Sequence, residues 1–281
     1  MVVKDLLKFG KEQLATKNIG AVDAEILLAN VLGIERMELH SRSIDLAPEQ
    51  AEEMKALYTK AIAQRLTGMP TQYIVGSAPF RYLEYEVGPG VLIPRPETEL
   101  LVDEVLHQLN TFAEPVSVVD LGSGTGAIAI SIASETAGKK EIHVVAVEKS
   151  PEALVWLNKN ITKHDLPVRI IESGAADALE GIKCDVVVAN PPYLPDGAKV
   201  PQELIFEPAM ALFGGPANGM AIPNEFIQAA SRLLKSGGLF AIEHNELQGP
   251  LIAKELESEF EAIALHNDLT DRPRFTTARR K

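Results

Sequence analysis

One four-residue motif in this sequence has the residue types needed to bind a planar, nitrogen-bearing group: Asn190-Pro191-Pro192-Tyr193. Two consecutive prolines fix two φ angles and bias Asn190 toward an extended conformation. The backbone carbonyls of Asn190 and Pro191, together with the Asn190 amide oxygen, then become rigid hydrogen-bond acceptors. Tyr193 adds a flat apolar face with a polar tip. These groups suit a planar nitrogen that donates two hydrogens, either a carboxamide or an exocyclic aromatic amine.

A second motif is glycine-rich and runs Asp120-Leu121-Gly122-Ser123-Gly124-Thr125-Gly126. Glycines at such a place let the backbone turn sharply and let a ligand approach main-chain N–H groups. Gly122, Gly124 and Ala127 also fit the dinucleotide-binding pattern G-x-G-x-x-G/A. Glu148 ends the next apolar run, residues 144–148. A carboxylate at this position of such a fold can accept hydrogen bonds from ribose hydroxyls. Because NAD and S-adenosylmethionine both contain that ribose, these residues favour nucleoside binding without choosing between the two.

Strand–helix alternation from residue 116 onward positions both motifs. The expected strands are 116–121, 142–148, 168–172, 184–189 and 239–243, and helices are expected at 127–134, 151–160 and 224–234. Near-continuous β-branched runs between helices predict an α/β fold with a parallel sheet buried on both faces. In a doubly wound sheet the first and fourth of these strands lie side by side, and ligands bind beyond their carboxyl ends. We therefore expect the glycine loop and the tetrapeptide to face one crevice, with an antiparallel C-terminal edge hairpin at 262–266 and 275–278.

The residues before this alternating pattern predict two further parts. Residues 1–75 show helical periodicity alone, including a long helix over 47–66, and predict a small bundle that serves as a docking domain. Residues 76–94 predict a β-hairpin linker whose turn lies at 88–90. The catalytic domain then spans 95–281 and opens with a helix that has prolines at its entry.

Composition narrows the class of protein. The 281 residues are 46% apolar and 23% charged, which is ordinary globular usage. The single cysteine, Cys184, excludes an intrachain disulfide and a multi-cysteine zinc site, and the six histidines form no metal motif, so no metal is expected. No apolar run approaches the roughly 18 residues of a membrane helix, and the N-terminus lacks a signal-peptide core. We expect a soluble, cytoplasmic protein without a membrane partner.

Charge argues against a nucleic-acid substrate. The net charge is −12, and residues 76–281 carry 29 acidic against 18 basic side chains. Nucleic-acid binding draws on clustered lysines and arginines that displace counterions from phosphates. No direct nucleic-acid substrate is therefore expected.

The tetrapeptide with its upstream Gly-x-Gly-x-Gly loop resembles the S-adenosylmethionine-dependent methyltransferases that act on planar nitrogens, which include DNA adenine-N6 and protein glutamine-N5 enzymes. From about residue 65 to Arg279 the sequence resembles one family more closely, the PrmC (HemK) release factor glutamine methyltransferases. The motifs that carry this resemblance are Gly76, Pro79-Phe80, Leu92-Ile93-Pro94-Arg95-Pro96-Glu97-Thr98-Glu99, Phe206-Glu207-Pro208, Gly237-Gly238 and Glu243-His244.

The resemblance implies a Rossmann-like class I methyltransferase domain and a substrate, the glutamine of the Gly-Gly-Gln motif in class-1 peptide chain release factors. Its N5 nitrogen would take the methyl group of S-adenosyl-L-methionine, leaving S-adenosyl-L-homocysteine. The implied catalytic and substrate-binding residues are Asn190, Pro191, Pro192 and Tyr193. The implied cofactor-binding residues are Asp120, Gly122, Ser123, Gly124, Thr125, Gly126, Glu148, Ala175 and Asn190. The helical domain would help to grip the release factor, and the enzyme is expected to be a monomer.

The sequence departs from the family pattern after the third strand. Gly174 and Ala175 stand where the family often has an acid and an aromatic residue near the adenine. Arg95 has two interpretations, since it either anchors the linker or lines the cofactor cleft.

Three other functions stay open at this point. One is an adenine-N6 DNA or RNA methyltransferase that uses the same tetrapeptide, although no basic or aromatic-rich recognition segment accompanies it. Another is a catalytically silent nucleoside-binding docking protein. The third is an NAD-dependent oxidoreductase, which the glycine loop permits but which gives the tetrapeptide no role.

Overall fold

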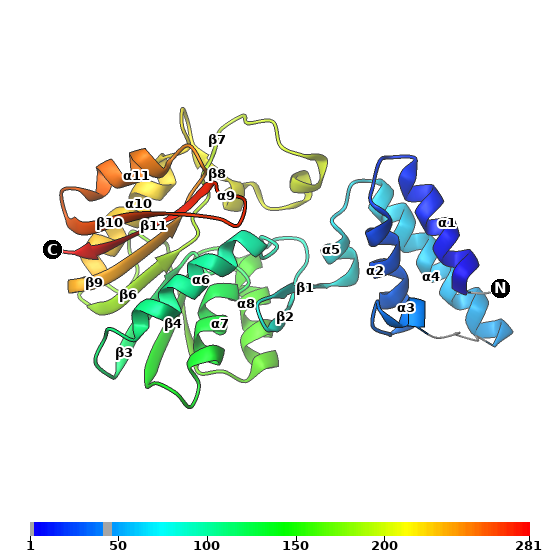
Figure 1. Cartoon of the computed structure of the whole chain (residues 1–281), viewed down its shortest axis with the longest axis horizontal. Coiled ribbons are helices and arrows are strands. Elements are labelled where there is room, and N and C mark those ends of the chain that lie inside the picture. The colour runs from blue at the N-terminus through cyan, green and yellow to red at the C-terminus, as the bar shows by residue number, and fades with distance from the viewer. Residues whose placement is uncertain (1–2, 42–46) are drawn as a thin grey trace. The chain divides into compact units, whose positions relative to one another are not determined.

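The computed structural model describes residues 3–41 and 47–281, which fold into two compact units (Figure 1). The first unit lies within Met1–Ser77 and Val200–Phe206, and the second comprises Ala78–Lys199 and Glu207–Lys281. The chain therefore returns to the first unit for seven residues after the strand that carries the tetrapeptide. None of the helices in the described ranges is both long enough and apolar enough to span a membrane.

The first unit is helical, as the periodicity predicts. Its helices are α1 (Val3–Ala15), α2 (Ala21–Leu32), α3 (Glu38–Ser41), α4 (Pro48–Leu66) and α5 (Thr71–Val75). The predicted long helix is confirmed by α4, which has proline at its first turn. Leu14, Leu27 and Tyr58 are fully buried between these helices, and the Tyr58 hydroxyl donates a hydrogen bond of 3.0 Å to the Ala24 carbonyl. Residues 1–2 and 42–46 of the predicted helical domain lie outside the described residues.

A buried arginine joins the returning segment to this helical unit. Arg65 is 5% exposed, and its Nε donates a hydrogen bond of 2.6 Å to Asp23 Oδ2. Its guanidinium also pairs with Glu203, which lies on the short 3₁₀ helix η1 (Gln202–Phe206). One buried cation thus holds two carboxylates from distant parts of the chain, a contact that sequence periodicity does not reveal.

The second unit contains a seven-stranded sheet with the order β10-β11-β9-β6-β3-β4-β5. Its strands are β3 (Val116–Leu121), β4 (Ile142–Glu148), β5 (Val168–Glu172), β6 (Cys184–Ala189), β9 (Leu234–Glu243), β10 (Phe260–Asn267) and β11 (Pro273–Arg280). The pairs from β9 to β5 are parallel, whereas β11 runs antiparallel to both of its neighbours. The predicted α/β fold, with a mostly parallel sheet and an antiparallel C-terminal edge, is confirmed. The β9 strand begins five residues earlier than expected, before a register shift opposite Cys184 and Val186.

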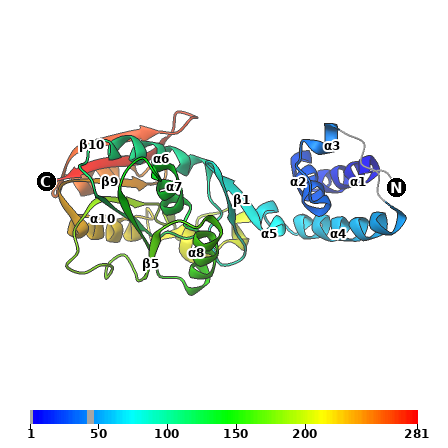
Figure 2. The same ribbon diagram turned by 90° about the horizontal axis from the view of Figure 1, so that it is seen from below.

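Helices cover both faces of this sheet (Figures 1 and 2). The helices on one face are α6 (Pro96–Leu109), α7 (Ala127–Thr136) and α8 (Pro151–His164), and those on the other are α10 (Ala221–Leu233) and α11 (Gly249–Leu256). Successive side chains of β6 alternate between the two cores: Val186 and Val188 pack on the first face, Val187 and Ala189 on the second. Burial on both faces explains the continuous apolar runs in the sequence.

A hairpin lies within the predicted linker, but the predicted turn at 88–90 is wrong, and the strand expected before it is itself divided by the turn. The paired strands are β1 (Ser77–Phe80) and β2 (Leu83–Glu86), so the turn lies at Arg81 and Tyr82. Arg81 has a φ of 52°, its N–H donates to Glu99, and its guanidinium pairs with Asp103 at 2.7 Å. These long-range contacts hold a turn that glycine and proline do not mark. Short elements complete the unit: β7 (Leu194–Pro195), α9 (Ala209–Leu212) and β8 (Phe213–Gly215).

Candidate active site

The glycine loop connects β3 to α7. Gly122, Gly124 and Gly126 all have positive φ, at 71°, 55° and 83°. At Gly126 a Cβ atom would also lie 2.6 Å from Leu157 Cδ1, so a side chain there would require Leu157 to shift. The N–H groups of Gly122 and Ser123 donate to the Val147 carbonyl at 2.8 and 2.9 Å, which ties the loop to the end of β4.

Asp120 lies beneath this loop and is fully buried. Its Oδ2 accepts a hydrogen bond of 3.2 Å from the Ala129 N–H in the first turn of α7. Oδ1 is buried and has no hydrogen-bond partner among the residues that the structure describes. Burial raises the pKa of this carboxyl to about 7. Asp120 therefore contacts the start of α7, where a helix presents its positive end, and a hydrogen bond with Ser123 of the loop lowers its pKa.

Glu148 ends β4 and is held by backbone amides. Its Oε2 accepts a 2.9 Å hydrogen bond from the Gly124 N–H, and Oε1 accepts from the N–H groups of Lys149 and Ser150 at 2.8 and 2.7 Å. The residue is 7% exposed. A carboxylate offers about four acceptor positions, so these three bonds fix its orientation and leave acceptor capacity on Oε2.

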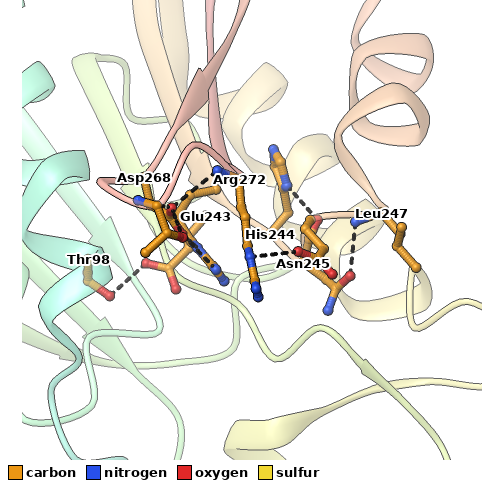
Figure 3. A network of polar contacts seen from close by, with 10 residues as sticks. Thr98, Glu243, His244, Asn245, Leu247, Asp268 and Arg272 are labelled. Atoms are coloured by element: carbon orange, nitrogen blue, oxygen red, sulfur yellow. Dashed lines mark hydrogen bonds and ion pairs between the residues drawn. The ribbon is translucent and has the colours of Figure 1, made fainter.

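Asn190 follows β6, which pairs with β3 in parallel register as predicted. Its Nδ2 donates a hydrogen bond of 3.1 Å to Thr98 Oγ1 on α6. The Thr98 hydroxyl in turn donates a hydrogen bond of 2.6 Å to Glu243 Oε2 at the end of β9 (Figure 3). Thr98 and Glu243 are 4% and 1% exposed. The amide nitrogen of Asn190 therefore donates a hydrogen bond within the protein. Its oxygen accepts no hydrogen bond within residues 3–41 and 47–281.

The rest of the tetrapeptide is fixed through its backbone. The Tyr193 carbonyl accepts a 2.9 Å hydrogen bond from Gln248 Nε2, which also donates to the Asn218 carbonyl at 2.7 Å. Gly214 packs so closely that a Cβ there would lie 2.5 Å from the Pro192 carbonyl oxygen. Burial raises the pKa of the Tyr193 phenol, so the side chain stays neutral.

A cavity of about 330 Å³ joins the glycine loop to the tetrapeptide. Known small-molecule sites measure about 300–1,000 Å³. Of the sequence-predicted site residues, the cavity is lined by Gly122, Ser123, Gly124, Thr125, Glu148, Ala175, Asn190 and Pro192. Four others lie outside this lining, namely Asp120, Gly126, Pro191 and Tyr193. The two motifs therefore face one crevice, as expected.

Several lining residues are not among the predicted site residues. They include Val91, Leu92, Pro94, Arg95 and Thr98 before and within α6, and Ile222, Glu225 and Phe226 of α10. The apolar residues of α10 have the periodicity of any core helix, so the sequence gives no signal that some of them line a cavity. For the residues before and within α6, the prolines that precede this helix are the feature of the sequence that could have indicated a role in the cavity, because they keep that segment extended.

The two interpretations of Arg95 do not exclude each other. It lines the cavity, and its guanidinium forms an ion pair with Glu207, whose side chain is 1% exposed. The second oxygen of Glu207 accepts a 2.9 Å hydrogen bond from the Ile93 N–H. One buried carboxylate therefore anchors the extended segment that borders the cavity.

A second polar network lies near Glu243, on the side away from Thr98 (Figure 3). Asp268 accepts hydrogen bonds from Arg274 Nε and Nη2 at 3.2 and 2.9 Å and from the backbone of its own turn. His244 Nδ1 lies 2.9 Å from the Asn245 carbonyl, which can only accept, and Nε2 lies 2.9 Å from Thr276 Oγ1. Burial lowers the pKa of His244, which is consistent with a neutral ring. No group of three or more potential metal ligands occurs in the described part of the chain.

Two known protein families match separate parts of the chain. Residues 5–76 match the family described as the PrmC N-terminal domain, and residues 96–217 match the methyltransferase small domain. The fold is similar to that of the T. thermophilus 16S rRNA N2 G1207 methyltransferase, with a TM-score of 0.53 and 23% identity over 73% of this chain and 50% of that one.

Sequence relatives extend over nearly the whole chain. The release factor glutamine methyltransferase of Mycolicibacterium smegmatis is 37% identical, with 92% of this chain and 90% of that protein covered. The protein of the same name from Bifidobacterium longum is 37% identical with 99% of each covered, and that from Streptomyces coelicolor is 38% identical with 92% and 90% covered. With its helical first unit, its methyltransferase sheet and these relatives, the chain belongs to the release factor glutamine methyltransferase family.

Proposed function

We propose that this protein transfers a methyl group from S-adenosyl-L-methionine to the side-chain amide nitrogen of a glutamine in class-1 peptide chain release factors. The observation that carries the proposal is the Asn190 amide. The nitrogen of the Asn190 amide is hydrogen-bonded to Thr98. The oxygen of the same amide can accept a hydrogen bond from a ligand in the cavity. A glutamine carboxamide presents two N–H donors, which suit this oxygen and a neighbouring backbone carbonyl.

The residues at the other end of the cavity fit the cofactor. Glu148 retains acceptor capacity for a ribose hydroxyl, and Gly124 leaves open space, since a Cβ there would contact only Val91 at 3.8 Å. Ala175, Ile222 and Phe226 give the lining an apolar portion for a planar base. When bound, S-adenosyl-L-methionine supplies an electrophilic methyl group on its sulfonium. Asp120 would support this end indirectly, from beneath the loop.

Positioning supplies most of the proposed rate enhancement. An amide nitrogen is a poor nucleophile because its lone pair is delocalised into the carbonyl. Hydrogen bonds to its two N–H groups contribute only about 0.5–1.5 kcal/mol each, whereas alignment of reacting groups lowers a barrier by as much as about 7–11 kcal/mol. Asn190 and the Pro191 carbonyl would therefore act by holding the nitrogen in one orientation. The released proton passes to water.

The test is methyl transfer from labelled S-adenosyl-L-methionine to a purified release factor. The matched controls are the same factor with its Gly-Gly-Gln glutamine changed to alanine, and duplex DNA. Label on the unmodified factor alone supports the proposal. Label on DNA alone would replace the substrate with an adenine, and cofactor binding without any transfer would favour a silent nucleoside-binding protein.

A further inference from the structure

The Asn190 amide is the near end of a hydrogen-bonded chain that reaches a buried carboxylate. Asn190 Nδ2 lies 3.1 Å from Thr98 Oγ1, which lies 2.6 Å from Glu243 Oε2. Asn190 directly follows β6, Thr98 lies in the first turn of α6, and Glu243 ends β9. Asn190 and Thr98 line the cavity, but Glu243 does not. Glu243 therefore acts on the cavity through Thr98 and through its own contact with the Asn190 side chain.

The donor and the acceptor of each hydrogen bond between Asn190, Thr98 and Glu243 can be assigned from the chemistry of their side chains. An ionised carboxylate only accepts hydrogen bonds, so the Thr98 hydroxyl must use its single hydrogen to donate to Glu243. Its oxygen is then an acceptor toward Asn190. Only the NH₂ group of the asparagine amide can donate to it. The amide oxygen must consequently take the opposite position, where it can accept a substrate N–H.

We propose that Thr98 and Glu243 are positioning residues that determine which atom of the Asn190 amide faces the substrate. The inference rests on the proposed glutamine methylation and names two further residues for it. If the amide rotated by half a turn, it would present NH₂ to the two N–H groups of the glutamine, and donors would face donors. Neither Thr98 nor Glu243 reacts with the substrate.

The charge on Glu243 controls this arrangement. Burial raises its pKa to about 7, and the charge of Glu97 on α6 raises it further. The hydrogen bond from Thr98, the charge of Arg274 on β11 and the hydrogen bond from the Asn190 side chain lower it. The neighbouring Tyr193 phenol is neutral, since burial raises its pKa. Below about pH 7 a protonated Glu243 is able to donate to Thr98. The threonine hydrogen is then free to donate toward Asn190, which permits the reversed amide.

Three substitutions test this hydrogen-bonded network, and two further substitutions at exposed positions serve as matched controls. Thr98→Val removes the hydroxyl, Thr98→Ser keeps it, and Glu243→Gln keeps the shape while it removes the charge. Thr162→Val and Glu255→Gln repeat the same chemical changes at exposed positions on α8 and α11. For every variant, kcat and KM for the release factor are measured from pH 6 to 9, and calorimetry gives the Kd of S-adenosyl-L-methionine.

We expect Thr98→Val to lower kcat by about 10- to 100-fold, since displacement of a positioning group by about 1 Å has effects of that size. The cofactor Kd should change little, and Thr98→Ser should restore most of the activity. The wild-type kcat should fall as the pH drops through about 7. In Glu243→Gln this decrease of kcat at low pH should disappear. At pH 8 the kcat of the variant should be lower than that of the wild type by about twofold if the two amide orientations are equally populated, and by up to about tenfold if the reversed orientation dominates.

The outcomes separate this inference from the proposed function. A wild-type enzyme that methylates the release factor, together with a Thr98→Val variant within about twofold of its kcat, would overturn the positioning role. A Glu243→Gln variant whose kcat still falls below about pH 7, as in the wild type, would also overturn it. A wild-type enzyme that leaves the release factor unlabelled refutes the proposed function instead, and the inference with it. Loss of activity in Thr98→Val that Thr98→Ser does not restore would indicate a packing defect and would also count against the proposal.

Discussion

Replacement of Gly124 by alanine tests the cofactor end of the cavity. Gly124 has a φ of 55°, and a Cβ there would contact only Val91 Cγ2 at 3.8 Å. A left-handed backbone costs an L-residue about 1–2 kcal/mol, which for a unit of this size lowers Tm by roughly 2–8 °C. The new methyl group would also occupy space next to the cavity. Overpacking costs about 1–3 kcal/mol, so we expect the Kd of S-adenosyl-L-methionine to rise roughly 5- to 150-fold, and Gly124→Val to block binding.

Two other glycines separate backbone strain from obstruction. Gly138 has a φ of 69°, and a Cβ there would meet no atom within 4 Å, so Gly138→Ala carries the strain alone. Gly126→Ala adds a clash, since its Cβ would lie 2.6 Å from Leu157 Cδ1, and should lower Tm most. The assays are thermal melts followed by circular dichroism and titration calorimetry with the cofactor. Equal cofactor affinity in Gly124→Ala and Gly138→Ala would refute the placement of the cofactor beside Gly124.

Three further predictions concern other parts of the site. Asn190→Ala should lower kcat by about 100-fold or more while the cofactor Kd changes little; near-normal turnover in steady-state assays would contradict the proposed mechanism. Arg95→Met leaves the buried Glu207 without its cation and should lower the free energy of unfolding by about 1–3 kcal/mol, measured by denaturant titration, whereas an unchanged value would show that the pair does not anchor the segment. Burial raises the pKa of Asp120 to about 7, above its value in the unfolded chain, so the folded protein binds the extra proton and loses stability as the pH rises from about 4 to 7. Asp120→Asn should remove that loss, and a Tm that has the same pH dependence as wild type would disprove it.

The sequence alone determined the parts of the fold that depend on local patterns. The bounds predicted for β3, β4, β5 and β6 agree with the structure because β-branched runs between helices specify buried parallel strands. The adjacency of β3 and β6 follows from the doubly wound topology. Together these features predict that the glycine loop and the tetrapeptide face one crevice. The roles predicted for the individual site residues, and the division into docking, linker and catalytic domains, stay predictions.

Tertiary structure decided the contacts between residues that are far apart in the chain. Glu243 lies 145 residues from Thr98, and no periodicity relates the two. The hairpin turn likewise lies at Arg81 because that residue finds carboxylates on α6 and α7, not because of its local sequence. Local patterns determine which face of an element is buried, since burial of apolar groups repeats along the chain. Which polar groups meet inside the fold depends on how those elements pack, and here that packing sets the orientation of the Asn190 amide.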